Sequence, residues 1–289
     1  MFTITPKSLT TALLVTFVWI VGGYELYDTI THFSEQWYWY PLALIYTVAL
    51  NDCFVHMCCG HALYEIDTTR IGYKITSFLA TVENGWGPIT TLCLIHKNHH
   101  MYSDQGNKDC SNWRNHWYNM SLLSPINYIY QEKTEYPDAD NFFKKQREVH
   151  KNILDDLWTF FIEEYSNWLT VLYWIVLYFV CPIFLFKIVF MGRFLMSLIS
   201  PFASITGHVW LPTNYRNFNT PDTSYNNIIF YYLTLGIYPT AIQNNHHGMR
   251  YSLKTGHKVR WFEFDLSVYI VKFLKYFTEK RGAKIDNGF

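Results

Sequence analysis

Histidines gather at four places in this sequence, and their spacing suits metal binding. His56 and His61 are separated by four residues, and His96, His99 and His100 form an H-x-x-H-H pattern. Side chains three or four residues apart share one face of a helix, so His96 can point at the same metal position as His99 or His100. His56 and His61 are less closely aligned. They can still bind if the helix ends or tilts between them, or if each meets a different metal.

Two further places complete the set. His208 ends a long apolar stretch, and Gln243, His246 and His247 repeat the i, i+3, i+4 spacing in a Q-x-x-H-H pattern. The clustered histidines are too many for one zinc ion, which takes about three or four protein ligands, and they suit two metal ions. Imidazole is a good ligand for iron, and redox chemistry on an apolar substrate would favour that metal. The isolated histidines are interpreted as ordinary polar residues: His32, His116, His150 and His257.

The histidines flank stretches that are apolar enough to cross a membrane. Charged residues make up 16% of the 289 residues, against about 25% in soluble proteins. A transmembrane helix needs about 20 mostly apolar residues. We predict one all-α integral membrane domain, residues 1–289, with four transmembrane helices at about 9–27, 39–60, 168–184 and 188–208. The last two share one apolar region, with a tight connection from Cys181-Pro182 to Lys187.

Lys and Arg are distributed unevenly outside these spans. The segment 28–36, between the first two spans, has none, whereas residues 248–289 contain nine Lys or Arg and four acidic residues. Because Lys and Arg favour the cytoplasmic side, we expect both termini and the metal site there. Residues 61–167 and 209–289 would then form a cytoplasmic helical cap that holds the site.

Two other apolar segments are less suited to crossing a membrane. Residues 73–95 are interrupted by Glu83 and by a Gly-Pro pair, so we expect interfacial or re-entrant helices there. Residues 268–277 carry Lys272 and Lys275 on an apolar stripe. This pattern predicts an amphipathic helix that lies on the membrane surface.

Charge and cysteine content exclude other classes of protein. The formal net charge is zero, which argues against a nucleic-acid binder that works by bulk charge. The 6 cysteines form no C-x-x-C pair. We therefore expect no disulfide framework and a reducing compartment for the polar parts.

The ordered motifs resemble the membrane fatty-acid desaturase family, in particular its stearoyl-CoA (delta-9) desaturase branch. Gly87-Pro88 precede His96 at the family's distance, and His99-His100-x-x-Ser103-Asp104 matches its H-H-x-x-S-D pattern. The likeness covers residues 40–275. Its closing segment consists of Tyr251-Ser252, Gly256-His257 and Trp261-Phe262-Glu263-Phe264-Asp265.

The resemblance implies four transmembrane helices and a cytoplasmic cap that holds two Fe2+ ions. The chain departs from the family at Gln243, where the third box usually begins with His, and at Ser204, where the fourth helix carries Asn. Front-end desaturases also carry Gln at the first position. Gln243 offers a neutral oxygen ligand or a hydrogen bond to metal-bound water, and Ser204 can hydrogen-bond such a water. The iron ligands implied by the resemblance are His56, His61, His96, His99, His100, His208, His246 and His247.

The activity implied is O2-dependent formation of a cis double bond, delta-9-like, in a fatty-acyl chain. The chain would be carried by CoA, acyl carrier protein or a lipid. Because the sequence has no haem-binding H-P-G-G motif, electrons would come from a separate protein of the cytochrome b5 or ferredoxin type. One alternative is a membrane di-iron fatty-acid or alkane hydroxylase with the same cofactor. Another is a non-catalytic membrane metal-binding protein.

Overall fold

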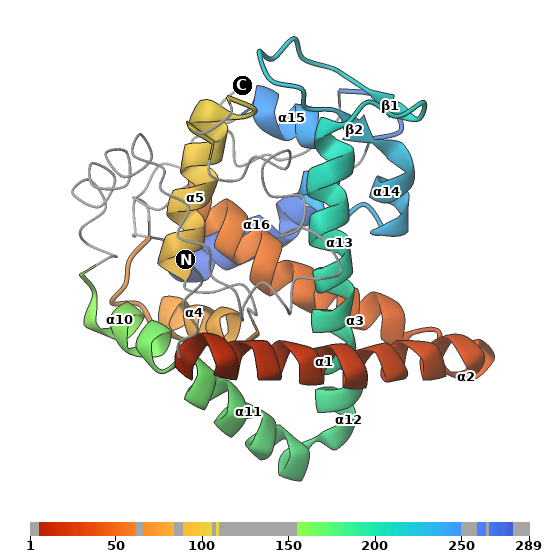
Figure 1. Cartoon of the computed structure of the whole chain (residues 1–289). Coiled ribbons are helices and arrows are strands. Elements are labelled where there is room, and N and C mark those ends of the chain that lie inside the picture. Colours follow the sequence, from red (N-terminus) through yellow and green to blue (C-terminus); the bar gives the residue numbers. More distant parts are fainter. Residues whose placement is uncertain are drawn as a thin grey trace.

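The protein is mostly helical, as predicted, with one very short hairpin (Figure 1). The computed structural model describes residues 6–61, 66–83, 89–105, 108–109, 155–249, 259–263 and 266–279. In chain order its elements are α1 (Pro6–Thr31), α2 (Phe33–Gln36), α3 (Trp39–Val48), η1 (Ala49–His61), α4 (Ile71–Glu83), α5 (Ile89–Tyr102), α10 (Leu157–Glu164), α11 (Ser166–Val180), α12 (Pro182–Phe184), η4 (Leu185–Phe190), α13 (Met191–His208), β1 (Asn214–Tyr215), β2 (Asn226–Asn227), α14 (Ile228–Leu233), η5 (Pro239–Ala241), α15 (Gln243–Gly248) and α16 (Ser267–Thr278).

In the part of the chain that the structure describes, three helices are long and apolar enough to cross a membrane. They are Leu9–Thr31 in α1, Trp39–Cys59 in α3 and η1, and Pro182–His208, which runs from α12 through η4 into α13. The remaining predicted span corresponds to α11, which is apolar but has 15 residues. At about 1.5 Å per residue it reaches roughly 22 Å, which is short of the roughly 30 Å hydrocarbon core of a bilayer.

The turn between α11 and α12 is shorter than predicted. α11 ends at Val180, and Pro182 already begins α12, because proline suits the first position of a helix, where its missing N–H is not needed. The prediction of a connection reaching Lys187 is therefore wrong, since Lys187 lies inside η4. There its ammonium pairs with Glu25 (2.8 Å) and Asp28 (2.5 Å) of α1, which compensates charges that are costly within apolar segments.

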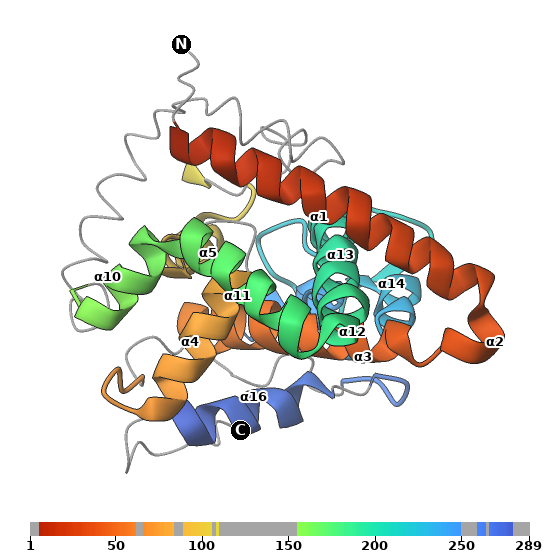
Figure 2. The same ribbon diagram turned by 90° about the horizontal axis from the view of Figure 1, so that it is seen from below.

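α1 packs tightly against the η4–α13 helix and crosses it steeply (Figures 1 and 2). A Cβ atom at Gly22 would lie 2.3 Å from the carbonyl oxygen of Phe190. The missing side chain thus allows the two backbones to touch, as small residues do between membrane helices. Large apolar side chains on the opposite side of α1 and on α11, such as Ile20 and Phe179, are exposed. Such faces suit contact with lipid.

The larger apolar core lies between α3, η1, α4, α5, α13 and α16, around side chains such as Leu44, Phe54 and Met57. Helices in residues 73–95 are confirmed, because α4 and α5 lie on either side of residues 84–88, which are outside the described part. The interfacial or re-entrant placement of these helices stays a prediction. α16 confirms the predicted helix at 268–277. Lys275, however, is buried and pairs with Glu279, so only Lys272 lies on the exposed face.

Glu83 joins four helices inside this core. Its carboxylate accepts a hydrogen bond from Tyr46 of α3 (3.3 Å), whose hydroxyl contacts that of Tyr173 of α11 (3.1 Å). Arg193 of α13 donates to the carbonyl of Val82 in α4 (3.1 Å). Burial raises the pKa of Glu83 to about 7, although Arg193 and the two tyrosines act in the opposite direction.

Candidate metal centre

The C-terminal ends of α5 and α13 meet η1, α15 and the hairpin at one end of the molecule, at the top of Figure 1. Seven of the predicted histidine ligands converge there in two groups that could each hold a metal ion. Within each group the ligand atoms lie within 4.8 Å of one another. The first group consists of His56, His96, His100 and His246, and the second consists of His99, His208 and His247.

Helical periodicity divides the two clustered motifs between these groups. In α5, His96 and His100 belong to the first group, whereas His99 belongs to the second. The choice left open by the sequence is thus settled in favour of the i, i+4 pair. α15 behaves in the same way, since His247 joins the second group, near Gln243 four residues earlier, and His246 joins the first. Each of these two helices therefore contributes to both groups.

His56 lies on η1, a π-helix of 13 residues. In a π-helix each N–H bonds the carbonyl five residues earlier, which brings residues i and i+5 closer to one face than they are in an α-helix. This winding gives the H-x4-H spacing a backbone explanation that an α-helix would not. His61 is the last residue of η1, and its side chain lies outside the described part of the structure.

The nitrogens of the first group face one another at short range. His246 Nε2 lies 3.1 Å from His56 Nε2 and 2.8 Å from His100 Nε2. His56 Nδ1 contacts Asp52 at 2.9 Å, and because a carboxylate only accepts, the proton is on Nδ1 and a lone pair on Nε2. Ligands at right angles around a metal with bonds of about 2.1 Å lie about 3 Å apart. The donor set therefore fits a metal ion.

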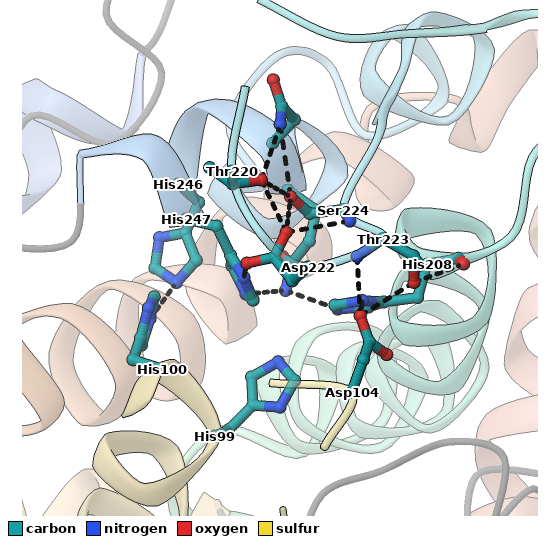
Figure 3. Close-up of polar contacts among 12 residues, drawn as sticks. His99, His100, Asp104, His208, Thr220, Asp222, Thr223, Ser224, His246 and His247 are labelled. Carbon is teal, nitrogen blue, oxygen red and sulfur yellow. Dashed lines mark hydrogen bonds and ion pairs between the residues drawn. The ribbon is translucent and has the colours of Figure 1, made fainter. Parts of the chain in front are cut away.

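In the second group every histidine has an aspartate on Nδ1. His208 lies 3.2 Å from Asp104 and His247 lies 2.8 Å from Asp222 (Figure 3). His99 Nδ1 lies 3.0 Å from Asp109. Metal-binding histidines almost always donate their second ring N–H to such a partner, which fixes the ring and makes it a stronger ligand. The three Nε2 atoms are thereby available for one metal ion.

Asp104 connects three parts of the chain around His208. Its carboxylate also accepts hydrogen bonds from the backbone and the hydroxyl of Thr223, both at 2.8 Å, and its N–H donates to Asp109 (3.0 Å). Its φ of 62° is left-handed, a conformation that Asp adopts more readily than most residues. The bonds from His208 and Thr223 hold the pKa of Asp104 below its ordinary value, although burial alone would raise it.

Asp222 is held in the same loop, one residue before Thr223. It accepts from the Ser224 N–H (3.0 Å), the Ser224 hydroxyl (2.5 Å) and the Thr220 hydroxyl (2.7 Å). Burial would raise the pKa of Asp222, but these bonds and that from His247 keep it well below the usual range. The carboxylate therefore stays charged and can only accept from His247.

The pKa values of the two buried histidines of this group outside the spans shift in opposite directions. Burial lowers the pKa of His99, but Asp109 outweighs burial, so the net shift is upward. Burial and the neighbouring histidines His99 and His208 lower the pKa of His247 to about 4, against the effect of Asp222. His247 is thus a neutral ligand near pH 7, the form that metals bind.

Gln243 is buried between two ligands of the second group. Its Nε2 lies 3.3 Å from His208 Nε2 and 2.9 Å from His247 Nε2. Within the described residues its Oε1 accepts no hydrogen bond. Rotating the side-chain amide by half a turn would place Oε1 in the present position of Nε2, facing His208 and His247. Both predicted roles, oxygen ligand and hydrogen bond to a metal-bound water, therefore remain open.

Ser204 lies in α13, and its side chain is outside the described part of the structure. Sequence reasoning missed the roles of Asp52, Asp109 and Asp222, and it noted Asp104 only as a motif residue. Asp52 carried a local signal, since it stands four residues before His56. Asp222 carried none, because 25 residues separate it from His247.

Comparison with known proteins adds no family assignment, because no family model and no curated protein matches the chain.

Proposed function

We propose that the chain is a membrane fatty-acyl desaturase that holds two Fe2+ ions in the two histidine groups. The observation that carries the proposal is that the groups lie side by side, share α5 and α15, and take His56 and His208 from helices long and apolar enough to cross a membrane. Two adjacent imidazole-rich positions without thiolates suit iron better than a structural zinc site.

The proposed reaction consumes O2, two electrons and two protons, and turns –CH2–CH2– of an acyl chain into cis –CH=CH– with release of two waters. The bound irons would activate O2, the oxidant that removes the two hydrogens. The chain's own residues have two roles. The histidine ligands are oriented by four carboxylates, those of Asp52, Asp104, Asp109 and Asp222. The apolar helices offer a surface for an acyl chain.

The wider arrangement is also part of the proposal. We propose four spans, with α11 as the third, and a cytoplasmic cap that contains the metal centre, because Lys and Arg are concentrated in residues 248–289 and absent from 28–36. The substrate is an acyl chain on CoA, acyl carrier protein or a lipid. Electrons come from a separate cytochrome b5 or ferredoxin-type protein.

The test is expression in a host that lacks delta-9 unsaturation, followed by mass-spectrometric location of any new double bond. A new cis alkene supports the proposal. A hydroxylated lipid without a new alkene would favour the hydroxylase alternative. Full iron loading without oxidation of any acyl chain would favour a non-catalytic metal-binding protein.

A matched pair of variants assigns the chemistry to the site. His99→Ala removes a buried ligand of the second group and should abolish product and lower iron content. His32→Ala removes a histidine whose side chain is 58% exposed and outside both groups, and should leave both unchanged. Equal product from His99→Ala and the wild type would exclude the proposed site.

A further inference from the structure

α15 carries Gln243, His246 and His247 but has six residues. A helix this short is not stable by itself, and none of its ends has a side-chain cap within the described residues. All residues from Gln243 to His247 are buried. The direction in which the two histidines point must therefore be set by contacts from outside the helix.

The two asparagines between the glutamine and the histidines supply those contacts. Asn244 Oδ1 accepts from the backbone N–H groups of Asn217 (2.7 Å) and Phe218 (2.8 Å). Asn245 Oδ1 accepts from the Nδ2 groups of Asn217 and Asn226, both at 2.8 Å. The backbone N–H of Asn245 donates to Asn226 Oδ1 (3.1 Å). Residues of the β1–β2 hairpin thus hold α15 through Asn244 and Asn245, on the side of that helix that faces away from the metal centre.

Asn217 is itself held by a buried carboxylate. Its Nδ2 donates to Glu263 Oε1 (2.7 Å), which also accepts from the Tyr215 hydroxyl (2.6 Å). Glu263 Oε2 accepts from the backbone N–H groups of Val259 and Arg260, both at 2.9 Å. The carboxylate is 0% exposed. Hydrogen bonds to a charged acceptor are stronger than neutral ones, so Glu263 is a firm anchor for Asn217.

Arg260 completes the arrangement. Its Nε donates to Asn217 Oδ1 (2.7 Å), and its guanidinium stacks over the Tyr215 ring at 4.3 Å. Asn217 is therefore fixed at both ends of its amide, by Glu263 and by Arg260. This chain of contacts connects residues 259–263 to α15 through Asn217, which bonds both Glu263 and Asn245.

We propose that Glu263 is a positioning residue that orients His246 and His247 through Asn217, Asn244 and Asn245. The inference rests on the proposed metal centre. It gives residues 259–263 a role that local sequence does not suggest, since Glu263 lies 16 residues beyond His247.

The experiment is titration of the metal-free full-length protein with Co2+ in detergent micelles, followed by the visible ligand-field bands. Glu263→Gln keeps the size of the side chain but replaces one acceptor oxygen with an NH2 donor. This donor would face either the N–H groups of Val259 and Arg260 or the Asn217 amide and Tyr215 hydroxyl, which are also donors. We expect metal affinity to fall about 10-fold or more and the bands to change shape, because the imidazoles bind at altered angles.

The matched control is Glu279→Gln. Glu279 is also a buried carboxylate near the C-terminus, but it pairs with Lys275. Its replacement by glutamine should therefore leave the Co2+ spectrum unchanged. Wild-type affinity and spectrum in Glu263→Gln would overturn the inference.

A second variant covers the case in which Glu263→Gln does not fold. Arg260→Gln alters an exposed side chain and should cause a smaller loss of affinity in the same direction. If Glu263→Gln is unfolded and Arg260→Gln binds Co2+ like the wild type, Glu263 is structural and the inference fails. Absence of Co2+ binding by the wild type would instead reject the metal centre, and the positioning role with it.

Discussion

Four aspartates determine which nitrogen of a histidine is available at the metal centre. Asp52, Asp104, Asp109 and Asp222 each accept from an Nδ1 atom. Each therefore keeps the proton on the side of the ring away from the group's centre. In the second group this holds for all three histidines, and Gln243 adds a neutral amide. The nitrogen that each of these rings turns toward the metal position is thus set by its aspartate.

Asp222→Asn tests this role at a single side chain. Asparagine keeps the shape of the residue but loses the charge that holds the Nδ1 proton of His247. We expect a loss of metal affinity of about 10- to 100-fold at the second group, measured as iron per chain and by Co2+ titration. Asp156→Asn serves as the control, because Asp156 caps α10 and asparagine caps a helix equally well. Equal iron content in both variants would contradict the role of Asp222.

The histidines could be predicted from the sequence because helical spacing is local. Residue type and distance along the chain were enough to identify five candidate ligands: His96, His99, His100, His246 and His247. Their division into two groups could not be predicted, since three-residue and four-residue spacings were equally acceptable for one face. The carboxylate of Asp222 was also hidden, because it reaches His247 only after the hairpin folds back on α15.

At the scale of elements, α13 and α15 touch at a glycine. A Cβ atom at Gly207 would lie 2.9 Å from Cβ of Gln243, closer than real Cβ contacts. The helix that carries His208 can therefore approach the helix that carries His247 only if residue 207 has no side chain.

Gly207→Ala should push α15 away and lower metal content, because His208 and His247 belong to the same group. The measurement is iron per chain together with the thermal midpoint of unfolding. Gly23→Ala is the matched control, since its Cβ would meet its nearest neighbour at an ordinary 3.5 Å. Full iron content in Gly207→Ala would show that α15 can shift without loss of the site.

The meeting of α3, α4, α11 and α13 at Glu83 predicts a pH dependence of stability. The folded pKa of about 7 is above the ordinary value of 4.5, so the stabilising form is the protonated one. That contribution is complete below about pH 4.5 and is lost as pH rises through about 7. The shift corresponds to a fall of about 3 kcal/mol in the free energy of unfolding.

Thermal unfolding in detergent micelles at pH 5 and pH 8 measures this effect. The midpoint of the wild type should fall between these pH values by more than that of Glu83→Gln, whose amide does not titrate. Glu164→Gln changes an exposed carboxylate of α10 and should retain the wild-type dependence. Equal pH dependence in Glu83→Gln and the wild type would rule out Glu83 as its source.

At the scale of the whole molecule, the apolar segments and their approximate limits could be predicted from composition. The third predicted span, residues 168–184, is not confirmed, because the corresponding helix α11 has 15 residues and a span needs about 20. The crossing of α1 over α13 was also invisible in the sequence. It depends on Gly22 meeting the backbone at Phe190, a contact between segments more than 160 residues apart.

The proposed orientation predicts where a membrane-impermeant maleimide reacts. Ser34 and Thr69 are exposed residues on either side of the span formed by α3 and η1. With Cys181 replaced by serine, Ser34→Cys should react from the non-cytoplasmic side of intact cells or vesicles, and Thr69→Cys only after permeabilisation. The reverse pattern would invert the topology, and reaction of both from one side would mean that α3 and η1 do not span.

The metal centre takes its ligands from η1, α5, α13 and α15, and α15 is held by residues 259–263. This dispersion along the chain sets an order of events during synthesis. The first histidine group is complete only after residue 246 has left the ribosome and the second only after residue 247, and Glu263, which supports α15, follows 16 residues after His247. A metal ion held by either group can therefore bind only after the apolar helices have been made. A chain made while its metal is scarce would keep the full ligand set and could bind the ion later without new translation.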